Sequence, residues 1–254
     1  MLRHRPPDAA WASLHAKPRT IPHIWKADIA ASRRFVEAVV YVLRAGVAWE
    51  DLPERSGGPS SVHRRFRRRA REGVRDELFL DGIPTDALGT VMLDASAGKA
   101  RRHATGARGG GEPALGRSRG GLTTKIHAAV DGFGRPSGFL LTPGRAADRR
   151  QARALLEGST FGRLIGDRGH DTDEPRAWAE ELGAEAVIPA KRDRKVPMPH
   201  DRRAHKGRHK VEDLSCRIKD FGRIVLRKCK TSRSHAGFVS LALTLTLINI
   251  QLCP

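Results

Sequence analysis

Residues 205–219 read HKGRHKVEDLSCRIK, and this stretch decides how the rest of the chain is interpreted. On a helix with about 100° per residue, four polar side chains share one narrow stripe: His205, Arg208, Glu212 and Lys219. The apolar residues fall on the opposite face: Val211, Leu214, Ile218 and Phe221. An amphipathic helix of this kind turns its apolar face to a protein core. The pattern therefore predicts a carboxylate, flanked by nitrogen bases, that points into a site for a polyanionic partner.

The charge of the whole chain agrees with a polyanionic partner. The 254 residues include 47 Lys and Arg against 28 Asp and Glu, which gives a formal net charge of +19. Such an excess favours nucleic acid over a membrane surface, because Lys and Arg release the counterions of the phosphates that they neutralise. An Ala-, Gly- and Arg-rich chain can also be basic by composition alone. The clustering of the positive residues favours the nucleic-acid interpretation.

The cysteines and the two ends of the chain predict a cytoplasmic protein. Cys216, Cys229 and Cys253 form neither a CxxC motif nor a zinc-ligand spacing, so we expect reduced thiols. The first residues, MLRHRPPDAAW, lack the apolar segment of a secretory signal. The apolar segment 236–253 is interrupted by polar residues and is short for a membrane span. We therefore expect a buried C-terminal helix, no membrane partner and a nucleoid-associated location.

Residues 1–85 predict a small all-helical domain. One amphipathic helix is expected from Ser32, as its N-cap, to Trp49, and a second begins at Ser61. A helix, a turn and an arginine-rich helix follow one another in the order of a helix-turn-helix DNA reader. A solvated basic helix explains the pattern equally well. On the first interpretation four arginines contact DNA: Arg64, Arg65, Arg67 and Arg68.

Residues 86–254 predict an α/β domain with a mixed sheet flanked by helices. Strands are expected at 91–94, 122–130, 137–142, 163–167 and 184–189, with helices after the third and fourth strands and at the end. Residues 97–121 contain eight glycines and six Lys or Arg against one Glu, so we predict a flexible basic loop. Within or just beyond this loop, three residues are expected to contact DNA: Arg117, Arg119 and Lys125.

Three acidic residues have a context that the other acids lack. Asp94 and Asp167 are predicted at the carboxyl ends of strands, where ligand sites form in open α/β sheets, and Glu212 lies on the polar stripe. Carboxylates without His or Cys suit Mg²⁺ or Mn²⁺, and two such ions can drive phosphoryl transfer. Asp167 could instead form a strand-end turn.

Other polar residues near these acids have ordinary structural interpretations. Asp131 is expected in a hairpin turn, and Asp148 as the N-cap of a helix that runs to Leu156. Three histidines are expected in loops or in packing rather than as ligands: His103, His127 and His170.

The spacing His205-x2-Arg208-x3-Glu212-x6-Lys219 resembles the Tyr-x2-Arg-x3-Glu-x6-Lys signature of bacterial insertion-sequence transposases of the DDE class, with His205 in the place of the tyrosine. Further stretches resemble the same family: VMLDAS around Asp94, GRSRGGLTTKIHAAVDGFGRP at 116–136, LLTPGRAAD at 140–148, LIGDRGHD around Asp167, and VIPAKRDRK at 187–195. The likeness extends over residues 30–250.

The resemblance implies a ribonuclease H-like catalytic fold after the helical DNA-binding region. It implies that Asp94, Asp167 and Glu212 are catalytic and bind Mg²⁺ or Mn²⁺ as a pair of ions. It also implies cleavage and strand transfer at the terminal inverted repeats of an insertion element, by a homo-oligomer bound to double-stranded repeat and target DNA. His205, Arg208 and Lys219 would hold the DNA strand. Two alternatives stay open: a DNA-binding repressor with an inactive catalytic domain, and a related host nuclease.

Overall fold

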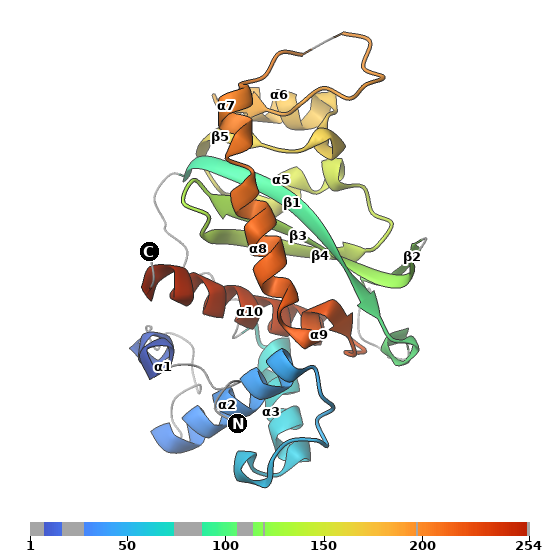
Figure 1. Cartoon of the computed structure of the whole chain (residues 1–254). Coiled ribbons are helices and arrows are strands. Elements are labelled where there is room, and N and C mark those ends of the chain that lie inside the picture. Colours follow the sequence, from blue (N-terminus) through green and yellow to red (C-terminus); the bar gives the residue numbers. More distant parts are fainter. Residues whose placement is uncertain are drawn as a thin grey trace. The chain divides into compact units, whose positions relative to one another are not determined.

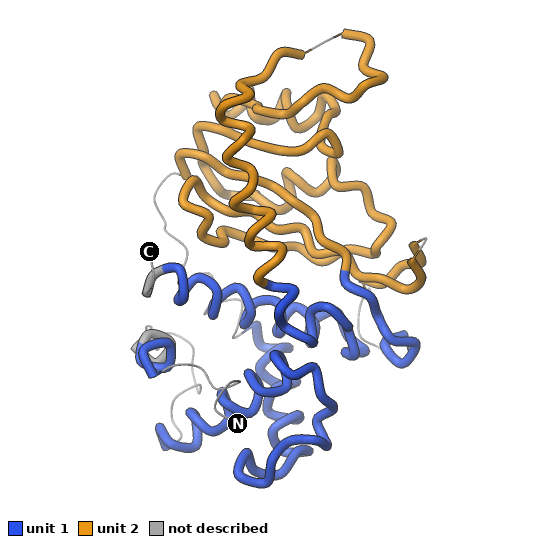
Figure 2. Tube along the Cα trace, viewed as in Figure 1, with its two compact units in different colours: residues 1–82, 98–113, 218–254 blue, residues 83–97, 114–217 orange. Residues whose placement is uncertain are grey.

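The computed structural model describes residues 8–16, 28–73, 88–105, 114–118, 120–196 and 198–252. The chain forms two compact units, coloured in Figure 2. Unit 1 contains residues 1–82, 98–113 and 218–254, and unit 2 contains residues 83–97 and 114–217. The units thus differ from the predicted domains 1–85 and 86–254, because the C-terminal helix packs with the N-terminal helices. Within the described ranges, no helix is both long and apolar enough to cross a bilayer.

Unit 1 is mainly helical. Its α-helices are α1 (Asp8–Ala16), α2 (Ile29–Ala45), α3 (Pro59–Arg71), α9 (Gly222–Val225) and α10 (Ser232–Leu252). A 3-10 turn, η2 (Glu54–Ser56), lies between α2 and α3. The rings of Phe66 in α3 and Phe238 in α10 lie 4.4 Å apart, centroid to centroid, and Trp49 packs against both. This aromatic cluster joins segments that are more than 150 residues apart in the sequence.

The start of α2 differs from the prediction. Asp28, not Ser32, is the N-cap, and its side chain accepts a hydrogen bond from the Ala30 amide. Ser32 lies one turn inside the helix and is buried. Asp and Ser both cap helices well, so residue type does not decide between Asp28 and Ser32. The N-cap is set by where the apolar face of the helix begins. The helix ends at Ala45, four residues before the predicted limit at Trp49, and its C-cap Gly46 has a left-handed conformation.

Unit 2 is built on a mixed sheet, which confirms the predicted α/β class. The strand order is β2-β3-β1-β5-β6, and β4 also pairs with β3. The strands are β1 (Leu88–Ala100), β2 (Gly116–Ser118), β3 (Gly121–Asp131), β4 (Pro136–Pro143), β5 (Phe161–Ile165) and β6 (Glu185–Val187). Strand β3 is antiparallel to both β2 and β4, whereas β1, β5 and β6 are parallel. The turn between β3 and β4 is formed as predicted, with Asp131 Oδ1 accepting from the amides of Phe133 and Arg135.

Helices and turns flank this sheet (Figure 1). They are η4 (Asp148–Arg150), α5 (Ala152–Leu155), η5 (Arg168–His170), α6 (Asp173–Glu181), α7 (Arg202–Lys206) and α8 (His209–Lys219), whose last two residues belong to unit 1. The core under α5 and α6 combines Leu164 of β5 with Leu156, Phe161 and Trp178. Such burial of large apolar side chains contributes about 1.5–3 kcal/mol per residue.

The prediction of a flexible loop over residues 97–121 is wrong at both ends of that segment. Strand β1 continues to Ala100 and pairs there with β7 (Leu226–Arg227), through Lys99 opposite Leu226. A 3-10 turn follows at Arg102–Thr105 (η3), β2 begins at Gly116, and residues 106–113 and 119 lie outside the described ranges. Glycine content misled the prediction, because Gly98 is needed for close packing: a Cβ there would lie 2.7 Å from the Ile224 carbonyl oxygen.

The predicted helix 205–219 is also interrupted. Helix α7 ends at Lys206 and α8 starts at His209, and the amides of Gly207 and Arg208 bond three residues back. Glycine at position 207 weakens a continuous helix. The amphipathic face is confirmed nevertheless, since four apolar side chains are at most 8% exposed: Val211, Leu214, Ile218 and Phe221.

We predict that Gly144→Ala destabilises the protein by about 1–3 kcal/mol, the usual cost of overpacking. A Cβ at this position would lie 1.8 Å from Thr123 Oγ1 and 2.8 Å from Thr123 Cβ, and Thr123 is buried. Urea unfolding followed by circular dichroism measures the change. Gly89→Ala is the matched control, because nothing lies within 4 Å of a Cβ there. Equal midpoints for the two variants would contradict this account of the β3–β4 edge.

Candidate active site

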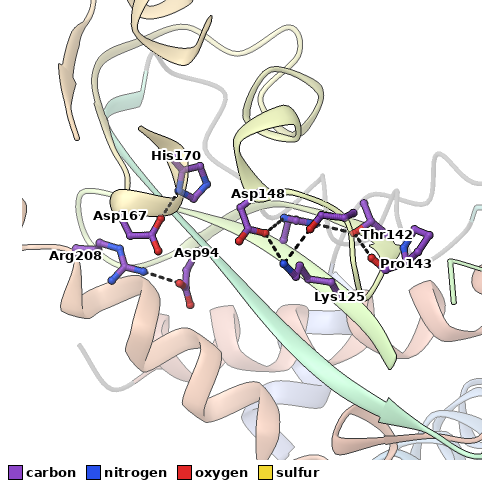
Figure 3. Close-up of polar contacts among 10 residues, drawn as sticks. Asp94, Lys125, Thr142, Pro143, Asp148, Asp167, His170 and Arg208 are labelled. Carbon is purple, nitrogen blue, oxygen red and sulfur yellow. Dashed lines mark hydrogen bonds and ion pairs between the residues drawn. The ribbon is translucent and has the colours of Figure 1, made fainter. Parts of the chain in front are cut away.

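A guanidinium joins two of the three predicted acids. Arg208 lies in the turn between α7 and α8, and its Nη2 donates to Asp94 Oδ1 at 2.6 Å (Figure 3). Its Nη1 donates to Glu212 Oε1, one helical turn further on. The Arg208 side chain is only 13% exposed. Arg208 and Glu212, which share the predicted polar stripe, thus form one ion pair. A second ion pair, from Arg208 to Asp94, connects this region to the sheet.

Asp94 lies within β1 rather than at its end, because the strand continues for six more residues. Burial raises the pKa of the Asp94 carboxyl, while the hydrogen bond from Ser215 and the charge of Arg208 act in the opposite direction. Ser215 Oγ donates to Asp94 Oδ2 at 2.9 Å, so both carboxylate oxygens have a partner. The negative charge of Asp167 also raises the pKa of Asp94, which indicates that the two acids share one site.

Asp167 follows β5, as predicted for a strand-end acid. Its Oδ1 lies 2.7 Å from Nδ1 of the buried His170, in the short turn η5 (Figure 3). This hydrogen bond is the main reason that the pKa of Asp167 is lowered to about 2; burial opposes it, and the charge of Arg208 acts in the same direction as the hydrogen bond. Asp167 is 42% exposed and therefore accessible to a ligand. An accessible acid with a depressed pKa is ionised throughout the physiological range.

His205 lies close to Asp167, at the other end of the stripe. Burial lowers the pKa of His205, against the raising effects of the Gly166 backbone and the Asp167 charge. Its Nε2 is buried, and no described residue forms a hydrogen bond with it. Lys219, by contrast, is exposed at the end of α8. His205 and Arg208 thus lie with the acids.

The donor set suits a hard divalent cation. It consists of carboxylate oxygens and the Ser215 hydroxyl, without a thiol, which are ligands that Mg²⁺ and Mn²⁺ accept. Among the described residues, however, no three His, Cys, Asp or Glu side chains are grouped closely enough to hold an ion. Glu212 is 55% exposed and its carboxylate turns to Arg208. The residue types fit a divalent cation, and in this arrangement the Arg208 guanidinium provides the positive charge that neutralises Asp94 and Glu212.

A second polar network lies on β3 and β4 beside η4. Asp148 Oδ1 accepts from Lys125 Nζ at 2.9 Å and lies 3.4 Å from Nδ1 of His127 (Figure 3). His127 Nε2 is 2.8 Å from Thr142 Oγ1, and Lys125 Nζ also donates to the Ala146 carbonyl. Burial lowers the pKa of His127 to about 4, so the ring is neutral at pH 7.

This network corrects one prediction and bears on another. Asp148 is not an N-cap, since its side chain makes no capping hydrogen bond and faces Lys125 instead. Lys125 is 18% exposed and its ammonium is held inside the protein. Its predicted contact with DNA would require that these bonds break, and Arg117, exposed on β2, is better placed for such a role.

The arginines of α3 differ in exposure. Arg64, Arg67 and Arg68 are exposed, whereas Arg65 packs its guanidinium 4.4 Å from the centre of the Phe35 ring. Burial lowers the pKa of Arg65. Arg119 lies outside the described residues. Their contacts with DNA stay predictions.

Two residues of the site were missed from the sequence. Ser215 follows Glu212 by three residues, so it falls within about 60° of it on the helix, on the predicted stripe. His170 follows Asp167 by three residues in DRGH, a spacing that a tight turn brings into hydrogen-bond reach. Both signals were present, but a hydroxyl and a turn histidine also have many ordinary structural roles.

Comparison with known proteins gives family matches for two parts of the chain. Residues 89–247 match the family described as "Transposase DDE domain", and residues 7–79 match "Putative transposase of IS4/5 family". A Brucella ovis protein, "Putative transposase for insertion sequence element IS6501", is 40% identical over 123 residues, which is 48% of this chain and 95% of that protein. "Uncharacterized protein y4sN" of Sinorhizobium fredii is 38% identical over 77 residues, or 30% of this chain and 62% of that protein.

The chain therefore belongs to the insertion-sequence transposases of the DDE class. The family's catalytic domain implies a ribonuclease H-like fold, a divalent metal and DNA as a partner, and the mixed sheet of unit 2 is consistent with that fold.

We predict that His170→Gln raises the pKa of Asp167 from about 2 toward its ordinary value of 3.8, because the main lowering hydrogen bond is weakened. A depressed folded-state pKa contributes stability above the unfolded pKa and loses it as pH falls through the folded pKa. The stability difference between wild type and variant should therefore be largest above about pH 4 and shrink toward pH 2. Urea midpoints across this range measure it, with the exposed His103→Gln as control. A difference that is constant with pH would contradict the assigned cause.

Proposed function

We propose that this protein is an active transposase, which cleaves DNA at the terminal inverted repeats of an insertion element and joins the freed ends to target DNA. The observation that carries the proposal is the meeting of Asp94 and Glu212 on one guanidinium, with Asp167 close enough to perturb Asp94. These acids come from a strand, a strand end and a helix that are separated in sequence. Asp167 is both ionised, because its pKa is depressed, and accessible, which is what a ligand for a cation requires.

Asp94, Asp167 and Glu212 would hold the Mg²⁺ or Mn²⁺ ions, two in number. When bound, a pair of such ions supplies activation of the attacking hydroxyl and stabilisation of the leaving oxygen in an in-line displacement. The chain itself supplies the positions of the acids through β1, β5 and α8. Ser215 orients Asp94, and His170 keeps Asp167 ionised.

In this proposal Arg208 changes partner during the reaction cycle. Its guanidinium neutralises Asp94 and Glu212 in the free protein. When cations take over that neutralisation, the guanidinium is free to pair with a phosphate near the scissile bond, together with Lys219 and His205. Arginine suits such an exchange because its planar donors match carboxylate and phosphate equally well.

The two units would divide recognition from chemistry. Helices α2 and α3 would act as a helix-turn-helix-like reader of the terminal repeats, through the exposed Arg64, Arg67 and Arg68 and through Arg65. Unit 2 would be the ribonuclease H-like catalytic part. A homo-oligomer on DNA would hold both ends of the element, and the protein would associate with the nucleoid.

A DNA-binding repressor is the second candidate. It is favoured by the double ion pair of Arg208, which satisfies Asp94 and Glu212 without any metal. If the guanidinium never leaves, the protein binds the repeats and does not cut them. A host nuclease with the same site would instead cut without joining.

We predict that three variants, Asp94→Asn, Asp167→Asn and Glu212→Gln, each reduce the rate of strand cleavage by at least about 10³-fold and leave DNA binding largely intact. Each change removes a charge that would hold the ions while keeping the size of the side chain. Purified protein is incubated with labelled repeat ends and Mn²⁺, and nicked, double-cut and joined products are resolved on a gel. Asp213→Asn is the matched control, because Asp213 is exposed beside Glu212 and outside the stripe.

The products separate the candidates. Joined products in the wild type support the transposase, cut but unjoined ends indicate the nuclease, and bound, uncut DNA indicates the repressor. Full cleavage by any one of the three variants removes that residue from the assigned set.

A further inference from the structure

Unit 1 contains a basic cavity of about 450 Å³ at the junction of α3, α9 and the start of α10. Four cationic side chains line it: Arg67, Arg223, Lys228 and Lys230. Thr231 and Ser234 also line it, and none of the described lining residues carries a carboxylate. Glu50 and Asp51 act on these cations only at longer range. Within the described residues none of the four cations forms an ion pair. We call this feature the basic cavity.

Arg223 is the most telling of the cations. It is only 3% exposed, and its Nη2 donates to the Val47 carbonyl at 2.5 Å. Its Nε is buried and has no hydrogen-bond partner among the residues that the structure describes. The side chain is held largely away from water, and this burial lowers the pKa of the guanidinium. A buried charge with an unused donor is costly unless an acceptor completes its shell, and an anion in the cavity would do so.

The cations are held in place by backbone. Lys228 Nζ donates to the Gly46 carbonyl, one residue from the carbonyl that Arg223 uses. Gly46 has a φ of 68° and approaches Gly222 so closely that a Cβ on Gly222 would lie 3.0 Å from Gly46 Cα. The segment before Arg223 is therefore fixed against the end of α2. Fixed donors lose little entropy when they bind a ligand.

The amino end of α10 adds a further positive dipole. This helix is 21 residues long, and Thr231, just before it, accepts at Oγ1 from the Ser234 amide. Thr231 and Ser234 both line the basic cavity. Because the amino end of a helix carries partial positive charge and free amides, it favours a phosphate or another oxyanion.

The aromatic residues of the basic cavity are already occupied. Trp49 stacks on His63 with a centroid distance of 4.8 Å and on Phe238 at 5.9 Å. Arg223 also lies 5.9 Å from the centre of the Trp49 ring. Since Trp49 is 8% exposed and Phe66 1% exposed, these two rings offer an inserted base little surface on which to stack. The cavity therefore suits the charge of a nucleic acid rather than its bases.

We propose that the basic cavity binds one phosphate of the DNA backbone, as a contact outside both the active site and the exposed arginines Arg64 and Arg68 of α3. The proposal rests on the proposed function to the extent that DNA is the partner. It adds a site formed largely by residues 223–234, a segment far from α3 in the sequence. A phosphate contact of this type fixes position without reading base sequence.

The test measures DNA binding by the full chain in EDTA, so that it does not depend on cleavage. The double variant Lys228→Gln/Lys230→Gln should bind duplex DNA roughly tenfold more weakly at 0.1 M salt, and the slope of log K against log salt should fall by about 0.9. The control is Arg192→Gln/Arg233→Gln, which removes two exposed charges outside the basic cavity. Lys230→Gln alone, on an exposed side chain, should show part of the loss and guards against misfolding of the double variant.

Inorganic phosphate tests the site without DNA. Millimolar phosphate in a chloride buffer should shift the amide resonances of Thr231 and Ser234 in the wild type and not in the double variant. Equal affinity and slope for the double variant and the control would overturn the proposal, as would binding of phosphate with no effect on DNA. If the wild type binds DNA in this way but never cleaves it, the proposed catalysis fails while the phosphate site stands.

Discussion

The double ion pair of Arg208 is the interaction on which the active site depends. Asp94 and Glu212 are separated by more than a hundred residues, and one guanidinium draws their carboxylates together. Asp94 is half-buried, with a pKa raised by that burial, so removal of its partner would leave a poorly solvated charge. Breaking such a pair costs more than forming it contributes, which makes the pair a strong constraint on where α8 can lie on β1.

The partners of the site acids also explain how three carboxylates can lie close together in a chain of net charge +19. Each acid of the site has its own positive or hydrogen-bonding partner: Arg208 for Asp94 and Glu212, and His170 for Asp167. Without these partners the carboxylates would repel both one another and the phosphates of DNA. A site that binds divalent cations next to DNA needs such partners for its acids while the cations are absent.

The sequence was informative where a periodic pattern and a buried face coincide. The stripe and apolar face around Glu212, the hairpin turn at Asp131 and the acid after β5 were all predicted and are present. Two of the errors share a cause, because they concern contacts between distant segments. Asp148 has the pattern of a cap but pairs with Lys125, and the strand through Gly98 is stabilised by a segment around Leu226. No local rule contains those partners.

The basic cavity and the active site treat charge in opposite ways, and this difference has a functional meaning. In the active site three carboxylates lie near one guanidinium, so the site itself does not attract DNA and its chemistry depends on which cation neutralises the acids. In the basic cavity four cations lie without a carboxylate, and Arg223 has a buried donor still unused. Affinity would then come from uncompensated cations and would depend on salt, whereas cleavage would depend on the divalent metal. Salt would therefore control DNA binding and the divalent metal would control cleavage. The two controls vary independently because the basic cavity and the active site differ in their charges.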